Sequence, residues 1–284
     1  MGARFLALER TAEANVLVAD AACWWRASER AFGGQLVAQC IVAAGAVSPS
    51  AQGSVHAVHV HFVNAARMVR TRYEVLPLRE GRSFALYAVR GEELPNRRLI
   101  VSATVSFHAV APPDGLWTGV RLHAPPMPAV PPPEACAPGA MKAWEDSKAE
   151  GLAHVCWQTR PVAGSPYLCW VRWHGGSAEQ PLGGAHVEHA AALGFLSDLQ
   201  FLWAALWPHA ATHKVQMITS LDHGLYLHAE RPCASDWMLF KLDSPFAAAE
   251  RALVRGHVWA ADGRALASMV QEGVLRVRRV ASKL

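Results

Sequence analysis

Apolar and polar residues recur with two different periods along this chain, and each period predicts one kind of element. In the segment 194–207, apolar residues return every three or four positions, so they share one broad face of a predicted helix. Phe195, Leu199 and Leu202 lie on that face, and Asp198 lies at its edge. A half-buried carboxylate costs free energy unless hydrogen-bond donors or a bound water compensate. Asp198 is therefore a candidate functional residue, although a structural cap or salt bridge would also explain it.

The first half of the chain combines one strongly apolar helix with several strand-like segments. Gly33 and Gly34 precede the segment 36–44, which is apolar almost all round and must be enclosed by other elements. Segments with the alternating or apolar pattern of strands then follow at 55–63, 72–76, 83–89 and 99–109. A buried helix and a run of antiparallel strands predict an α+β unit of about a hundred residues.

The same order of elements returns in the second half, which predicts one module used twice. Around the helix at 195–207, strands are expected at 167–173, 220–228, 237–242, 252–259 and 266–277. In this alignment Gln35 and Asp198 open equivalent helices, and Thr104 and Gln271 fall in equivalent last strands. The prolines between 125 and 133 cannot support a central strand. We therefore predict an N-terminal domain at 1–110, a linker at 111–150 and a C-terminal domain at 151–284.

Composition excludes several classes of protein. With 52% hydrophobic and 18% charged residues the chain is globular, and no apolar run approaches the length of a membrane span, so we expect no membrane insertion. The N-terminal residues lack the apolar core of a secretory signal. The six cysteines form no Cys-x-x-Cys pair, which favours free thiols in a reducing compartment. A net charge of +4 is mild, and the basic residues near the C-terminus are interpreted as a solvated strand end, so no nucleic acid is expected as a partner.

Histidines crowd the strand expected at 55–63. His59 and His61 share one of its faces, as metal ligands could, and His56 lies nearby. Since no carboxylate or cysteine completes a ligand set at a suitable spacing, packed and hydrogen-bonded histidines are the preferred interpretation. We expect neither a metal nor another cofactor.

The last three residues of the chain are Ser282, Lys283 and Leu284. At a free carboxyl end this tripeptide is a peroxisomal import address that a receptor reads. We therefore expect location in the peroxisome matrix and an import receptor as a partner. Because peroxisomes metabolise fatty acyl-CoA, this location favours a reaction of acyl-CoA.

Several short sequence blocks, taken in order, resemble the acyl-CoA thioesterase II family. They are Phe32-Gly33-Gly34-Gln35, Val55-His56-Ala57-Val58-His59 with His61-Phe62-Val63, Arg79-Glu80-Gly81-Arg82-Ser83-Phe84, Leu196-Ser197-Asp198, Ser220-Leu221-Asp222-His223 and Val270-Gln271-Glu272-Gly273-Val274. With its C-terminal tripeptide, the chain looks most like the peroxisomal members. It departs from the family's pattern after the first long strand, where Asn64-Ala65-Ala66-Arg67 replaces the usual Pro-Gly-Asp turn.

The resemblance implies a tandem (double) hot-dog fold, with two antiparallel sheets each wrapped around a central helix. It also implies hydrolysis of fatty acyl-CoA to free fatty acid and coenzyme A. Because burying such sheets commonly requires edge-to-edge or face-to-face pairing, we also expect a homo-oligomer. The family's catalytic aspartate, hydroxyl residue and glutamine fall on Asp198, Ser220 and Gln271. Substrate contacts are expected at Gly33, Gly34, Gln35 and His59.

Thioester hydrolysis requires an activated water and donors for the oxyanion, but no protein nucleophile. The chain lacks a Gly-x-Ser-x-Gly elbow, and His174-Gly175-Gly176-Ser177 does not fit one, which argues against an acyl-serine route. The resulting hypothesis is that Asp198 draws a proton from water while Ser220 and Gln271 hold that water. Two alternatives remain open: an enoyl-CoA hydratase using Asp222 and His223, and a non-catalytic acyl-CoA binding protein.

Overall fold

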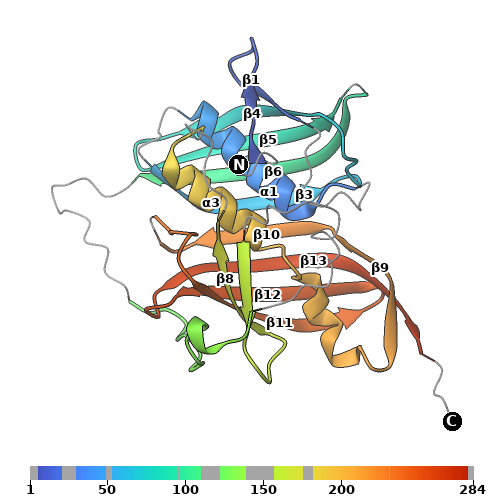
Figure 1. The fold of residues 1–284 in the computed structure, drawn as a ribbon. Coiled ribbons are helices and arrows are strands. Elements are labelled where there is room, and N and C mark those ends of the chain that lie inside the picture. Colours follow the sequence, from blue (N-terminus) through green and yellow to red (C-terminus); the bar gives the residue numbers. More distant parts are fainter. Residues whose placement is uncertain are drawn as a thin grey trace.

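Two helices lie side by side on the same face of one antiparallel sheet (Figure 1). The computed structural model describes residues 6–20, 30–48, 53–94, 96–109, 122–138, 157–174, 182–229 and 231–280. The first half contains β1 (Glu9–Arg10), β2 (Val16–Ala19), α1 (Gly33–Val47), β3 (Gly53–Phe62), β4 (Thr71–Glu80), β5 (Phe84–Glu93) and β6 (Arg98–Ala109). The second half contains β7 (Trp157–Pro161), β8 (Leu168–Trp173), α3 (Ala185–Leu196), η3 (Leu202–Ala205), η4 (Trp207–His209), β9 (His213–Ser220), β10 (Asp222–Leu227), β11 (Met238–Ala248), β12 (Arg251–Ala260) and β13 (Ala265–Arg279), and η2 (Pro133–Ala135) lies between the halves.

The expected strand alternation in the first half is confirmed, and it explains how α1 is enclosed. On β6, Val101, Val105 and Phe107 are buried toward α1, while Ser102 and His108 face the other way. Nearly every residue of α1 is buried, as expected for a helix that is apolar all round. Each half is therefore an α+β unit in which a sheet curves around a helix.

The two sheets expected from the resemblance are joined into one. Strands β3 and β10 pair antiparallel, with His59 opposite Gly224, so the described strands of both halves form a continuous 13-stranded sheet. This pairing satisfies the backbone groups of two strand edges that would otherwise be open. The double hot-dog fold is thus confirmed, with the correction that its sheets share a hydrogen-bonded seam.

The helices α1 and α3 approach closely where glycine faces the other helix. A Cβ atom on Gly194 would lie 2.8 Å from Ile41 Cδ1, and one on Gly45 would lie 2.7 Å from Val187 Cγ1. Both distances are shorter than side-chain packing permits, so the missing side chains are what allow this contact. The close crossing brings the end of α3 to the beginning of α1.

The helix predicted at 194–207 is wrong in its bounds. Helix α3 begins after Gly183 and Gly184, which both have positive φ, and it ends at Leu196. Gln200 has a φ of 57°, which a continuous right-handed helix cannot contain. The short helices η3 and η4 continue the apolar spacing with a period near three, which imitates an α-helical pattern. Asp198 therefore follows a helix and does not open one, so it is not the equivalent of Gln35 in the first turn of α1.

The sequence pattern also missed strand β9. Ser220 is the last residue of β9, and β10 begins only at Asp222, so the strand expected at 220–228 starts too early. β9 pairs with β13 and places Ser220 opposite Gly273. Because its residues are mostly half-buried and partly polar, β9 has no strong apolar alternation.

The described part of the expected linker, 122–138, packs against the second half. Trp259 and Trp170 donate indole hydrogen bonds to the carbonyl oxygens of Pro125 and Pro131, at 2.9 and 3.0 Å. Buried Cys136 joins these indoles in a small apolar cluster on the sheet face opposite the helices. This part of the segment is extended, as its prolines predict, but it is fixed to the sheet.

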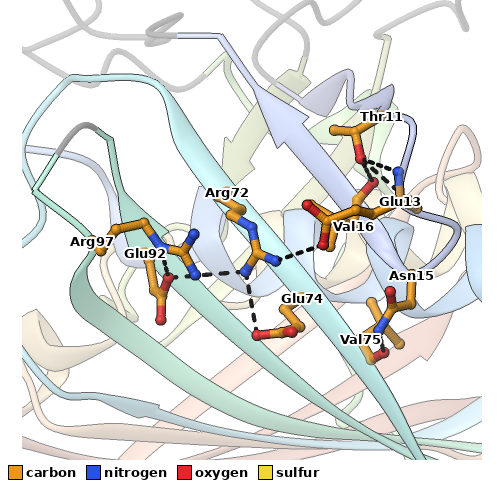
Figure 2. A network of polar contacts seen from close by, with 9 residues as sticks. All are labelled: Thr11, Glu13, Asn15, Val16, Arg72, Glu74, Val75, Glu92 and Arg97. Carbon is orange, nitrogen blue, oxygen red and sulfur yellow. Dashed lines mark hydrogen bonds and ion pairs between the residues drawn. The ribbon is translucent and has the colours of Figure 1, made fainter.

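The N-terminal strands β1 and β2 were not predicted, and an ion-pair network holds them to the sheet (Figure 2). Arg72 on β4 is almost buried and contacts Glu13 before β2, Glu74 on its own strand and Glu92 on β5. Arg97 donates to the same Glu92 at 2.6 Å. The network ties the first strands to the far edge of the sheet from the β3–β10 seam.

The loop at 64–67, where the sequence departs from the family pattern, is held by a fully buried carboxylate. Glu93 accepts the backbone N–H of Arg67 at 2.7 Å, and it also pairs with the side chains of Arg67 and Arg98. Burial alone would raise the pKa of Glu93, but hydrogen bonds from Arg98 and Arg67 lower it to about 2. The carbonyl oxygen of the preceding residue, Ala66, accepts the N–H of Ala31 just before α1.

No helix in the described parts of the chain is long and apolar enough to cross a membrane.

Candidate active site

Three separate elements of the second half bring Asp198, Ser220 and Gln271 together. Asp198 lies in the turn after α3, Ser220 ends β9, and Gln271 lies in the middle of β13. The amide nitrogen Nε2 of Gln271 donates to Asp198 Oδ1 at 2.8 Å and to Ser220 Oγ at 2.6 Å. The structure therefore assembles the three residues that the resemblance singled out into one hydrogen-bonded cluster.

The first half contributes the N-terminus of α1 to this cluster. The backbone N–H of Gly34 donates to Asp198 Oδ2 at 2.7 Å. A helix N-terminus carries partial positive charge and free N–H groups, so it favours a carboxylate there. Asp198 thus connects the two halves, and its two oxygens are bound by different donors.

Asp198 is almost fully buried, with 8% of its surface exposed. Burial raises the pKa of its carboxyl to about 6, and the hydrogen bonds from Gln271, Gly34 and Ser220 oppose this rise. A carboxylate with a pKa near neutrality is ionised at physiological pH but binds a proton readily. These are the properties of a general base.

Gln271 is completely buried, and its amide is oriented by the groups around it. Both hydrogens of Nε2 are donated, to Asp198 and Ser220, so Oε1 lies on the opposite side of the amide. Gln271 also shares a side-chain hydrogen bond with His223, whose pKa is lowered by burial and raised by this hydrogen bond. Ser220 accepts from Nε2 and donates its own hydrogen to Asp198.

The glycines expected at the substrate site lie directly against the carboxylate. A Cβ atom on Gly33 would lie 2.7 Å from Asp198 Oδ2, and one on Gly34 would lie 2.5 Å from the carbonyl oxygen of Phe195. Only glycine, which has no Cβ atom, permits the backbone to approach the carboxylate this closely. Gln35, the next residue, is buried in the first turn of α1.

His59 is not brought to this cluster. Its side chain lies on the exposed sheet face, edge-on to the ring of Tyr226 at 5.2 Å, while its neighbours Val58 and Val60 face the helices. The tripeptide Ser282–Leu284 lies outside the described residues. Across the described ranges, no group of three His, Cys, Asp or Glu side chains is arranged to hold a metal ion.

A buried histidine that the sequence analysis did not place at the site lies beside Gln271. His223 Nε2 lies 2.8 Å from Ser197 Oγ, and burial lowers the pKa of His223 to about 4, so its ring is neutral at physiological pH. Asp222 points away from it and accepts the N–H of Glu272 at 2.8 Å. The two residues considered as a hydratase pair therefore serve different partners on opposite faces of β10. The available sequence signal was the alternation of side chains along the strand after Ser220, which places His223 on the face opposite Asp222.

A duplicated α+β unit with a shared antiparallel sheet, and a buried acid between its halves, defines the class of double hot-dog proteins. Comparison with known proteins then identifies the family. Residues 21–108 match the model of the acyl-CoA thioesterase N-terminal domain, and residues 121–275 match that of the acyl-CoA thioesterase C-terminal domain. The chain belongs to the acyl-CoA thioesterase II family, and it is a thioester hydrolase that acts on acyl-CoA.

Individual relatives agree with this assignment. The chain is 33% identical to human acyl-coenzyme A thioesterase 8 over 90% of this chain and 83% of that protein. It is 26% identical to acyl-CoA thioesterase 2 of Haemophilus influenzae over 86% and 87% of the two chains. Among solved structures, acyl-CoA thioesterase II TesB2 of Mycobacterium marinum matches with a TM-score of 0.74 and 25% identity, over 97% of this chain and 98% of that one.

Proposed function

We propose that Asp198, Ser220 and Gln271 activate the water that hydrolyses fatty acyl-CoA to free fatty acid and coenzyme A. The observation that carries the proposal is the double donation from Gln271 Nε2 to Asp198 and Ser220. It holds a buried carboxylate and a hydroxyl in one geometry. A binding protein would have no use for such an arrangement.

In the proposed reaction, water attacks the thioester carbonyl carbon as Asp198 accepts one of its protons. The negative charge that develops on the carbonyl oxygen is stabilised by the positive end of the α1 dipole, since the N–H groups of Gly34, Gln35 and Leu36 already donate to Asp198 and Phe32. When the tetrahedral intermediate collapses, the carbon–sulfur bond breaks and the protonated Asp198 returns its proton to the coenzyme A sulfur. The carboxylate is thus regenerated, and no covalent intermediate forms on the protein.

The test is thiol release from a series of acyl-CoA lengths by Asp198→Asn, Ser220→Ala and Gln271→Ala. Removing one positioned group typically costs about a hundredfold or more in turnover. We expect each variant to remain folded and to lose at least that much, with Asp198→Asn the most affected. Loss of the enoyl-CoA chromophore without thiol release would instead support a hydratase, and tight acyl-CoA binding without thiol release would support a binding protein.

We also propose that the protein acts in the peroxisome matrix and that an import receptor reads Ser282-Lys283-Leu284. Residues 276–280, the last that the structure describes, are exposed. Deleting the tripeptide should redistribute a fluorescent fusion to the cytosol and leave thiol release unchanged. Retention in peroxisomes after the deletion would contradict this proposal.

The division into domains at 1–110 and 151–284, with a linker between them, remains our proposal, as does assembly into a homo-oligomer. The exposed sheet face carries Tyr226 and Val270 beside the β3–β10 seam, with 43% and 37% of their surface accessible. A second copy packed on this face would bury them. Sedimentation of the wild type and of a Val270→Glu variant tests this: a monomeric wild type would refute it.

A further inference from the structure

A group of arginines lies close to the start of α1 and takes no part in the chemistry proposed above. Arg67 and Arg98 both bind the buried carboxylate of Glu93, with shortest distances of 2.8 and 2.7 Å. Arg30 is exposed and lies opposite Arg67 in an isolated antiparallel bridge. Three guanidinium groups therefore accompany one carboxylate here, which leaves an excess of positive charge at this corner of the molecule.

Glu93 binds one edge of each guanidinium group and leaves the other edge unused. Arg67 donates Nε and Nη2 to Glu93 Oε2, at 3.1 and 2.8 Å. Arg98 donates Nε to Oε2 at 3.2 Å, and its Nη2 donates at 2.7 Å both to Oε1 and to the carbonyl oxygen of Ala65.

The remaining nitrogen, Nη1, makes no hydrogen bond in either arginine within the part of the chain that the structure describes. The side chains of Arg67 and Arg98 are 54% and 38% exposed, so an anion in solution can approach this edge. Because Glu93 already fixes both side chains, binding a further anion costs little additional rotamer entropy.

The backbone ties this arginine pair to the candidate active site. The carbonyl oxygen of Ala66, next to Arg67, accepts the N–H of Ala31 at 2.9 Å. Ala31 precedes Gly33 by two residues, a span of at most about 7 Å, and Gly33 lies directly against the carboxylate of Asp198. The two arginines therefore lie beside the candidate site, a few residues of backbone away from it.

Coenzyme A carries its negative charge at a distance from the thioester. Its diphosphate and its 3′-phosphate are separated from the sulfur by the uncharged pantetheine arm, which spans about 15 Å when extended. Phosphate oxygens match the fork of donors that arginine presents, and such charge-assisted hydrogen bonds are about twice as strong as neutral ones. A substrate whose carbonyl lies at Asp198 is thus long enough to place a phosphate on guanidinium groups a few residues away.

We propose that Arg67 and Arg98 form a subsite that binds the phosphate groups of coenzyme A. Nη1 of each arginine donates to phosphate oxygens, while Glu93 holds Nε and Nη2 and so sets the direction of both guanidinium groups. The loop at 64–67, where the sequence departs from the family's usual turn, thereby contributes a contact to the substrate. This inference rests on the position of the reacting carbonyl at Asp198 proposed above.

Substrates with and without phosphates test the subsite. We expect Arg67→Gln and Arg98→Gln, made singly so that Glu93 keeps one partner, to raise KM for acyl-CoA about tenfold with little change in kcat. The same acyl group on pantetheine, which lacks phosphates, should be hydrolysed by both variants as by the wild type. Arg255→Gln is the matched control and should change neither reaction, because Arg255 is also 54% exposed and pairs with Asp243 at 2.7 Å on the opposite face of the sheet.

Acyl-(3′-dephospho)-CoA distinguishes the two kinds of phosphate. A rise in KM that persists with this substrate assigns the diphosphate to the arginines, and a rise that disappears assigns the 3′-phosphate; both outcomes support the subsite. An equal rise for acyl-CoA and acyl-pantetheine, or an unchanged KM for acyl-CoA in both variants, would overturn the proposal.

Arg67→Lys provides the same measurement if a glutamine variant fails to fold. Lysine keeps a positive charge for Glu93 but has no second edge of donors, so KM should again rise for acyl-CoA and not for acyl-pantetheine. Thiol release by Asp198→Asn would refute the proposed function, whereas these KM values test the subsite alone.

Discussion

Replacing Asp198 by asparagine should make the protein more stable while it removes the proposed general base. In the native state burial raises the pKa of this carboxyl from 3.8 to about 6, so the ionised group destabilises the folded protein at neutral pH. Each pKa unit corresponds to 1.36 kcal/mol, and the shift therefore amounts to about 3 kcal/mol. Asparagine has nearly the same shape, carries no charge and keeps a donor and an acceptor for Gln271 and Gly34.

The pH dependence gives this prediction its specificity. Because the folded pKa is raised, the wild type binds more protons when folded, and its stability increases as the pH falls from above 6 toward 3.8. The advantage of Asp198→Asn should be fully present above pH 6, shrink through the window between these values and vanish below 3.8. Urea denaturation of both proteins at pH 7.5, 5 and 4 measures it directly.

A matched control is Asp262→Asn, which changes an exposed aspartate whose pKa is lowered by hydrogen bonds from Arg264. It should give no stabilisation at pH 7.5. If Asp198→Asn is destabilised at pH 7.5, or is stabilised equally at pH 7.5 and 4, then the carboxylate is not strained by burial and the reasoning fails.

Three further outcomes are expected. In the wild type, kcat/KM for acyl-CoA should fall about tenfold per pH unit below about pH 6, since Asp198 must be ionised; a flat profile contradicts this. Gly34→Ala should cost roughly a hundredfold in thiol release by displacing Asp198, whereas Gly224→Ala, with no atom within 3.6 Å of its new Cβ, should be nearly neutral. Glu93→Gln should lose about 3 kcal/mol in urea denaturation at pH 7, with the loss fading from pH 4.5 toward 2, because the folded pKa is lowered; a loss independent of pH contradicts this.

Strands with clear alternation were predictable from the sequence, and elements defined by backbone conformation were not. β6 was placed within a residue of its bounds because its apolar residues face a buried helix on one side only. The helix after Gly184 was misplaced because its first turns carry polar residues, while its residues at 190–196 are mostly alanine or other apolar residues and are buried on every side, so the segment gives little amphipathic signal. β9 was missed since most of its residues are polar and its strand character comes from pairing with β13.

The candidate site was predictable as residue types and not as geometry. Asp198 was singled out as a carboxylate at the edge of an apolar face, although the face belongs to a turn and two short helices. Ser220 and Gln271 came from the resemblance alone, because no local pattern marks two polar residues that meet across paired strands. The contribution of Gly34 depends on the crossing of α1 and α3, which no local sequence feature encodes.

The register of the sheet shows how the two halves of a repeated module differ at the candidate site. Beside the seam, Val58 in β3 pairs with Val105 in β6, whereas His223 in β10 lies next to the register position of Gln271 in β13. Thr104, which sequence spacing had matched to Gln271, faces the other side of the sheet. The first half thus keeps an apolar pair at the place where the second half has the amide and the imidazole, and its buried valines need no donors. What the first half supplies instead is a helix N-terminus, so the proposed base of one module is held by the backbone of the other, and the hydrogen-bonded cluster needs residues from both halves.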